Sequence, residues 1–186
     1  MKTAIFGGTF DPIHRAHLIV AREAADTFSL DRVLFIPAAN PPHKEAGASY
    51  EDRYKMVELA CAGEPRFVPS RLEEGREKSY SIHTIERVKA QPDSDEVFFV
   101  IGSDAFAEIR SWYRWEDVMR ETEFIVVSRP GHAYSIPPGT RVHRLETVAL
   151  PVSSSETRQA LARGETPEEL PPAVAEYIRE KGLYGA

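Results

Sequence analysis

Short runs of apolar residues alternate along the chain with stretches in which apolar residues recur at helical spacing. The apolar runs predict strands over 2–6, 32–37, 66–69, 96–101, 124–128 and 145–150. Helical spacing predicts helices over 15–28, 50–62, 81–90, 103–109, 114–120, 153–163 and 171–181. We expect Ser49 to cap the helix over 50–62 and Gly182 to end the last helix.

This alternation predicts the fold class. Apolar strands that alternate with helices are typical of a parallel sheet covered on both faces, and right-handed crossovers make it a doubly wound, Rossmann-like α/β fold. We expect a single domain over 1–186, with a small helical part at about 153–186. Ligands bind such sheets outside the carboxyl ends of the strands, where this chain has Gly7, Pro37, Gly102 and Arg129.

Composition and charge narrow the class of protein. The 186 residues are 42% hydrophobic and 28% charged, which is ordinary for a soluble domain. A single cysteine, Cys61, favours a reducing compartment, and we expect a cytoplasmic protein with no signal peptide and no membrane span. A net charge of −6 argues against nucleic-acid binding, whereas a locally positive pocket for a small phosphate ligand is compatible with it.

The first candidate site is the run Gly-Gly-Thr-Phe-Asp-Pro-Ile-His-Arg-Ala-His over 7–17. Gly7 and Gly8 permit a tight turn and close backbone approach to a ligand, and the following helix offers N–H groups to an anion. His14 and His17, three residues apart, can both face that anion and stabilise charge during phosphoryl or nucleotidyl transfer. The run matches neither the Walker nor the dinucleotide glycine pattern, and no third metal ligand lies nearby in the sequence.

This run closely resembles the signature of the nucleotidyltransferase superfamily that binds ATP through a (H/T)-x-G-H motif. Its Thr-Phe-Asp-Pro-Ile-His portion resembles that of the bacterial nicotinate-nucleotide adenylyltransferases. The resemblance implies a nucleotidyltransferase form of the Rossmann-like fold. It implies that the following residues bind ATP: Gly7, Gly8, Thr9, Phe10, His14 and His17. The family usually has glycine where this chain has Ala16, whose methyl group would crowd the nucleotide slightly.

The resemblance continues along almost the whole chain. Pro41-Pro42-His43-Lys44 resembles the family's loop after the second strand and implies that Lys44 reaches the ATP phosphates and the mononucleotide. The segment 79–85 resembles the family's Ser-Tyr-Thr-x-Asp-Thr motif. It implies a mononucleotide site with main-chain N–H groups near Thr84 available to the pyridine carboxylate. His83 stands where the family usually has aspartate.

Three later segments complete the implied site. Residues 101–104 resemble the family's Gly-x-Asp turn, which implies that Gly102 and Asp104 bind ATP and that the Asp104 carboxylate holds ribose hydroxyls or neighbouring groups. Residues 111–115 resemble its Trp-x-x-Trp segment and imply that Trp112 stacks on the pyridine ring while Trp115 packs in the core. The remaining residues implied for the mononucleotide are Gly8, Thr9, Tyr113 and Arg129.

The last motif opens the C-terminal helical part. Residues 152–158 resemble the family's Ile-Ser-Ser-Thr-x-Ile-Arg motif. The resemblance implies that Ser154, Ser155 and Arg158 form a second cradle for the ATP phosphates.

The implied reaction is in-line attack of the nicotinate mononucleotide phosphate on the α-phosphorus of ATP, which gives nicotinate adenine dinucleotide and pyrophosphate for NAD biosynthesis. The nucleophile is already an anion, so catalysis consists of positioning and charge stabilisation. The expected catalytic residues are His14, His17, Lys44 and Arg158. We expect Mg²⁺ to arrive with the ATP phosphates and no metal site in the protein.

Several alternatives stay open from the sequence. The closest are an adenylyltransferase acting on nicotinamide mononucleotide or on phosphopantetheine, although the latter usually has Ser-Phe-Asp-Pro-x-Thr and lacks the tryptophan pair. A nucleotide sensor without turnover would not need His14, His17, Lys44 and Arg158 together. A hydride-transferring enzyme would need a spaced-glycine turn that this chain lacks. The sequence also leaves a homo-oligomer open.

Overall fold

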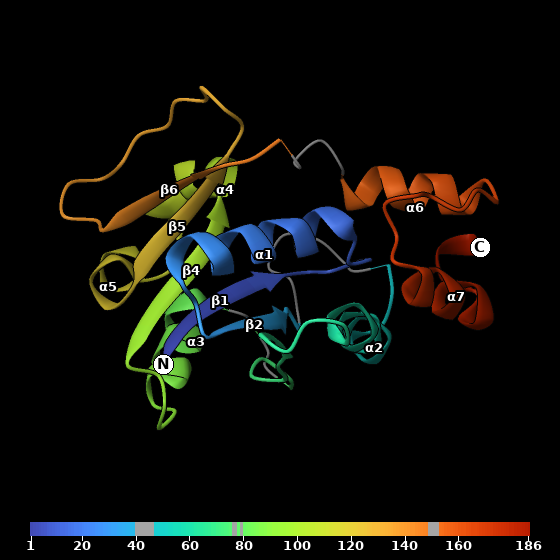
Figure 1. The fold of residues 1–186 in the computed structure, drawn as a ribbon, viewed down its shortest axis with the longest axis horizontal. Helices are drawn as coiled ribbons and strands as arrows, with labels where there is room; N and C mark the ends of the chain where they lie inside the picture. The colour runs from blue at the N-terminus through green and yellow to red at the C-terminus, as the bar shows by residue number, and fades with distance from the viewer. Residues whose placement is uncertain (40–46, 76–77, 79, 149–152) are drawn as a thin grey trace.

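The computed structural model describes residues 1–39, 47–75, 78, 80–148 and 153–186. Six parallel strands form one sheet in the order β3-β2-β1-β4-β5-β6 (Figure 1). Their bounds are β1 (Lys2–Gly8), β2 (Arg32–Pro37), β3 (Phe67–Pro69), β4 (Glu96–Gly102), β5 (Glu123–Ser128) and β6 (Val142–Glu146). The strand order reverses between β1 and β4, which is the doubly wound arrangement.

Helices cover both faces of the sheet. The bounds of the longer helices are α1 (Arg15–Phe28), α2 (Tyr50–Cys61), α3 (Ser81–Lys89), α6 (Ser154–Ala162) and α7 (Pro172–Lys181). The short ones are α4 (Ser103–Ala107), η1 (Ile109–Ser111), α5 (Trp115–Glu121) and η2 (Leu183–Gly185). No helix of the described residues is long and apolar enough to cross a membrane.

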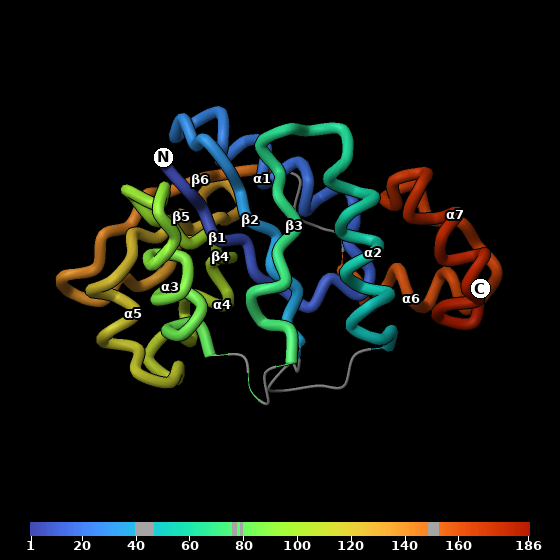
Figure 2. Tube along the Cα trace, turned by 90° about the horizontal axis from the view of Figure 1, so that it is seen from below, coloured from blue at the N-terminus to red at the C-terminus, as the bar shows by residue number. Residues whose placement is uncertain are grey.

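Side chains alternate between two hydrophobic clusters along each strand, as the pleat of a sheet requires. Ala4 and Phe6 of β1 pack in one cluster with α1, α2, α6 and α7. Ile5 packs in the other cluster with α3, α4, η1 and α5. Figure 2 shows α3 and α5 at one end of the molecule and α6 and α7 at the other, beyond α2. The C-terminal helices therefore share a core with α1 and α2.

The predicted helices and the four long strands are confirmed, with ends that differ by a few residues. Ser49 caps α2 by accepting a hydrogen bond from the Asp52 N–H, and Gly182 ends α7 in the left-handed region. The last strand was predicted over 145–150, but β6 is Val142–Glu146, so the prediction began three residues too late, and its residues 149–150 lie outside the described residues. This edge strand buries only Leu145, so the apolar run that begins at Val148 misplaced it.

The two glycines after the first strand do not form the predicted turn. β1 continues through both of them, because Gly7 pairs with Ile36 and Gly8 with Pro37 in parallel register. The turn lies at Asp11 and Pro12, directly after Phe10, which adopts a left-handed conformation with φ 50°. Parallel pairing with β2 through Pro37 therefore delays the turn and brings the backbone of both glycines to the carboxyl edge of the sheet.

Candidate active site

A cavity of about 1260 Å³ opens at the carboxyl ends of β1, β2, β4 and β5. It is larger than most drug-sized pockets, which hold about 300–1,000 Å³, and can take two ligands side by side. Its floor is where the strand order reverses, the position at which doubly wound sheets bind ligands. The predicted site residues that line it are Gly7, Gly8, Thr9, Phe10, His14, His17, Thr84, Gly102, Trp112, Tyr113, Ser154 and Ser155.

The end of β1 and the loop after it form one wall of the cavity, and the carbonyls of Gly8 and Thr9 accept hydrogen bonds from groups behind that wall. Ala38 N–H donates to the Gly8 carbonyl (2.8 Å), and Arg53 donates to the Thr9 carbonyl (2.9 Å). In a trans peptide the N–H of the next residue points the opposite way from the carbonyl. The N–H groups of Thr9 and Phe10 are therefore directed away from these donors, an arrangement suited to an anion.

Arg53 of α2 is the main internal support of this wall. Its side chain is 2% exposed, and its guanidinium donates to carbonyls of three segments: Thr9 (2.9 Å), Ala38 (2.7 Å) and Ala48 (3.2 Å). Burial lowers the pKa of Arg53, and the charge of Asp11 opposes that effect. Arginine suits this position because its planar fork carries five donors. Arg53 is absent from the sequence prediction, since an arginine inside a helical stretch resembles a surface residue.

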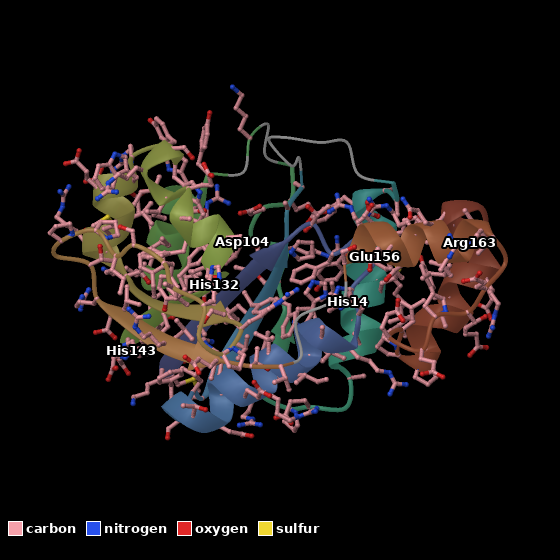
Figure 3. The ribbon with its side chains drawn as sticks, turned by 90° about the horizontal axis from the view of Figure 1, so that it is seen from above. His14, Asp104, His132, His143, Glu156 and Arg163 are labelled. Atoms are coloured by element: carbon pink, nitrogen blue, oxygen red, sulfur yellow. The ribbon has the colours of Figure 1, made fainter. Side chains whose placement is uncertain are left out.

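His14 and His17 lie at the start of α1, as Figure 3 shows for His14. Their rings are stacked, with centroids 3.8 Å apart. The main-chain N–H of His14 donates to ring Nδ1 of His17 (3.1 Å). Neutral His17 therefore carries its proton on Nε2. Nδ1 of His14 is buried and has no hydrogen-bond partner within the described parts of the chain. The pair therefore offers ring nitrogens to a ligand.

Both histidines are held neutral. Burial lowers the pKa of His14 to about 4, against a smaller opposing effect of the Glu169 carboxylate. Burial also lowers the pKa of His17 well below its ordinary value, and His14 adds to that shift. The start of α1 offers fewer free main-chain donors to an anion than predicted. The N–H of Arg15 is already used, because it donates to the Glu169 carbonyl (2.6 Å).

The α6 motif reaches the same loop from the other side. Ser154 Oγ donates to the Pro12 carbonyl (3.1 Å), and Arg158 donates to the Asp11 carbonyl (2.9 Å). Ser153 caps the helix by accepting from the Glu156 N–H (3.1 Å). Arg158 does not line the cavity, and the contact it makes here is with the Asp11 carbonyl behind the loop.

Aromatic side chains gather at the far side of the cavity. Tyr80 and Tyr113 have ring centroids 4.6 Å apart, and Trp112 packs edge-on against Phe99 (5.8 Å). All of these residues line the cavity. Trp115 is partly buried against the core, as predicted. A flat ligand ring would therefore find stacking partners at this end.

A buried carboxylate lies next to this aromatic group. Thr84 Oγ1 donates to Glu73 (2.7 Å), a residue that is 8% exposed, lines the cavity and is absent from the sequence prediction. The Thr84 N–H donates to the Tyr80 carbonyl (3.4 Å) within the first turn of α3. Earlier in that turn, the N–H of Ser81 has no acceptor inside the helix by geometry. Ser81 therefore offers the better-placed main-chain donor.

Four further residues that the sequence analysis singled out remain to be placed. Asp104 is exposed in the first turn of α4, across the central strands from His14 in Figure 3, and does not line the cavity. Arg129 follows β5 and is exposed. Lys44 lies outside the described residues. Ala16 lines the cavity at the position usual for glycine in the family.

Comparison with known proteins gives one consistent result. A model of the cytidylyltransferase-like family matches residues 5–160. A relative from Solibacter usitatus, named as a nicotinate-nucleotide adenylyltransferase, is 60% identical over 99% of this chain and 100% of its own length. One from Thermus thermophilus with the same name is 40% identical over 99% of this chain and 100% of its own. The structure of Plasmodium falciparum nicotinic acid mononucleotide adenylyltransferase complexed with NaAD has a TM-score of 0.83 at 20% identity. It covers 99% of this chain and 97% of its own, and shows the same fold.

Proposed function

The chain belongs to the cytidylyltransferase-like family and, within it, to the nicotinate-nucleotide adenylyltransferases, and we propose on that premise how its cavity works. It is a nucleotidyltransferase that transfers the adenylyl group of ATP to nicotinate mononucleotide, giving nicotinate adenine dinucleotide and pyrophosphate in NAD biosynthesis. The observation that carries the residue assignment is a single cavity with an anion-directed loop at one side and stacking aromatics at the other.

The ATP phosphates bind where the loop after β1 meets α1 and α6. The N–H groups of Thr9 and Phe10 and the imidazoles of His14 and His17 supply donors there. The remaining donors assigned to ATP come from Ser154, Ser155, Arg158 and, beyond the described residues, Lys44. The backbone of Gly7, Gly8 and Gly102 bounds this part of the cavity and lets the nucleotide approach closely, with Asp104 assigned to its hydroxyls.

The mononucleotide binds at the aromatic end. Trp112 and Tyr113 offer faces to the pyridinium ring, and the N–H groups at the start of α3, Ser81 first, receive the carboxylate. Thr84 remains among the residues assigned to the mononucleotide, but through its side chain, whose hydroxyl is held by Glu73. Gly8 and Thr9 lie between the two ends, where the two phosphates must meet, and Lys44 and Arg129 complete the set as cations.

The chain's residues need only position the reactants and stabilise charge. The attacking phosphate oxygen is already anionic, so no side chain has to remove a proton. Charge builds on the oxygens around the α-phosphorus and on the leaving pyrophosphate, where neutral His14 and His17 donate through ring N–H groups. Preoriented donors in a partly dehydrated cavity act more strongly than in water.

ATP enters as its Mg²⁺ complex, with the ion on the β- and γ-phosphates. Mg²⁺ prefers oxygen ligands and keeps several waters, so substrate phosphates can hold it without a protein cage. The described residues contain no group of three or more His, Cys, Asp or Glu side chains placed to hold a metal ion.

We place the enzyme in the cytoplasm, because its single cysteine, Cys61, is a buried free thiol with a pKa raised to about 12. Such a thiol is unreactive and suits a reducing compartment. We also propose that residues 1–186 act as one domain, because α6 and α7 pack into the same hydrophobic core as α1 and α2.

The test is pyrophosphate release from Mg·ATP with nicotinate mononucleotide and, separately, with nicotinamide mononucleotide. A large kcat/KM advantage for the nicotinate form is expected, because main-chain N–H groups favour a carboxylate over a neutral amide. Equal use of both would keep the reaction and refute the carboxylate site. Release with neither would refute the function, and phosphopantetheine would be the next acceptor to assay.

A further inference from the structure

The Asp11 side chain joins three parts of the chain next to the cavity. It is 3% exposed and lines the cavity between Phe10 and Pro12. Its carboxylate accepts hydrogen bonds from the N–H groups of Gly47 (2.6 Å) and Ala48 (3.1 Å), which precede α2. The third donor is the hydroxyl of Tyr184, which lies 173 positions along the chain in η2. The end of the chain therefore contacts the loop that carries the phosphate-binding N–H groups.

Packing holds the Tyr184 ring in this position. A methyl group built on Gly47 would come within 3.2 Å of the ring, so the glycine allows the ring to lie against the backbone. Tyr184 itself has φ 58°, a left-handed conformation that is strained for a residue with a side chain. Burial and the Asp11 carboxylate raise the pKa of Tyr184, so its hydroxyl stays a proton donor at neutral pH.

One carboxylate and two guanidinium groups surround this contact. Asp11 is the negative group, and Arg53 and Arg158 are the positive groups whose fields reach Tyr184. Both arginines donate to carbonyls of the same loop, Arg53 to Thr9 and Arg158 to Asp11. The loop is thus fixed through its carbonyls by two arginines and through its one acidic side chain by Tyr184.

We propose that Tyr184 is a positioning residue for adenylyl transfer: its hydroxyl, through the Asp11 carboxylate, holds the Thr9–Pro12 loop in the geometry that receives the phosphates. The proposal rests on the function given above. Tyr184 acts from η2 through Asp11, and the C-terminal part of the chain thereby contributes to catalysis as well as to the core. A small displacement of a phosphate-binding loop lowers rate steeply, since misplacement by about 1 Å can cost 10²-fold.

The test compares two tyrosines of the same C-terminal part. Tyr184→Phe removes the hydroxyl that reaches Asp11. Tyr177→Phe is the matched control, because the Tyr177 hydroxyl donates to a different carboxylate, Asp52 of α2 (2.7 Å), away from the loop. We expect Y184F to lower kcat about tenfold and raise KM for ATP about threefold, while Y177F keeps wild-type values. Partial unfolding alone would lower kcat without changing KM for ATP. A change in both parameters therefore indicates loss of positioning, and a change in kcat alone indicates loss of stability.

A double-mutant cycle with Asp11→Asn completes the test. If Tyr184 acts through Asp11, Y184F lowers kcat little further in the D11N background. Wild-type kcat in Y184F, or a full additional loss in the D11N background, would overturn the proposal. Absence of turnover in the wild type and in Y177F would overturn the proposed function, and the inference with it.

Discussion

The imidazole rings of His14 and His17 lie stacked at the start of α1, with centroids 3.8 Å apart and planes 20° from parallel. Two protonated rings at that distance would repel each other, and burial already disfavours the charge on each. The stack is therefore a pair of neutral N–H donors. They contribute to the reaction by orienting hydrogen bonds toward the substrate, since neither ring adds a full positive charge.

His17→Ala should lower kcat by about 10²-fold or more with a modest loss of stability, on the scale of a lost charge-stabilising donor. His17 lies in the cavity, and its Nδ1 is occupied by the His14 N–H, so only Nε2 is available to the substrate. Steady-state pyrophosphate release measures the effect. His143→Ala is a suitable control, because His143 lies on β6 beside Glu123 (3.6 Å). Near-normal kcat in H17A would remove His17 from the mechanism.

The stability of the fold should fall between pH 6.5 and about 4 because of the same two histidines. Their pKa is lowered in the folded chain, to about 4 for His14, so below pH 6.5 the unfolded chain binds protons that the folded chain does not. The full contribution is present above pH 6.5 and is lost as the pH drops, on the order of 1–3 kcal/mol.

Urea unfolding at pH 7.5 and pH 5 measures this loss. The double variant with His14→Gln and His17→Gln has no such titrating groups at the stack, so its stability should change less between the two pH values. An equal change in the variant and the wild type would assign the pH dependence to other groups.

Trp112→Ala should raise KM for the mononucleotide more than KM for ATP. Trp112 lines the cavity beside Tyr113 and packs on Phe99, at the end opposite the histidines. Loss of a stacking face costs about 0.5–1.5 kcal/mol beyond lost area, which corresponds to roughly a tenfold change in KM. Initial rates with each substrate varied in turn provide the comparison. The opposite ranking would place the pyridine ring elsewhere, and Trp115→Phe controls for general loosening of the segment.

The sequence predicted the sheet and its helices well because they depend on periodicity, which a single chain displays. Predicted residues from Gly7 to His17 meet Ser154 and Ser155 of α6 at one cavity, since parallel strands bring their carboxyl ends to one edge. The edge strand β6 was misplaced because only Leu145 in it is buried. Local apolar content identifies an element poorly when one side of it faces solvent.

The supports of the site could not be predicted, because each is a contact between different elements that no local sequence pattern displays. Glu73 reaches Thr84 across a turn, and Tyr184 reaches Asp11 from the other end of the protein. A tyrosine in the last turn of a chain and a glutamate in an acidic run carry no local signal of such contacts. Only the packing of α2, α3 and η2 around the cavity identifies them.

The three hydrogen bonds of Arg53 likewise have no local sequence signal, and their loss should lower the stability of the fold strongly. Arg53→Met preserves length and apolar packing but leaves the carbonyls of Thr9, Ala38 and Ala48 without their donor. Unsatisfied buried acceptors cost about 1–3 kcal/mol each before relaxation, so the variant should lose roughly 3–5 kcal/mol. Urea unfolding measures the loss, with the exposed Arg141→Met as control.

Activity should fall further than unfolding explains, because Arg53 fixes the Thr9 carbonyl and thereby the N–H groups on the cavity side of the loop. Arg53→Lys keeps the charge but has a single ammonium in place of a planar fork, so it cannot satisfy three segments at once. It should recover part of the stability and little of the kcat when both are measured well below the melting temperature. Full recovery of kcat by R53K would mean that the buried charge matters and the three-way geometry does not.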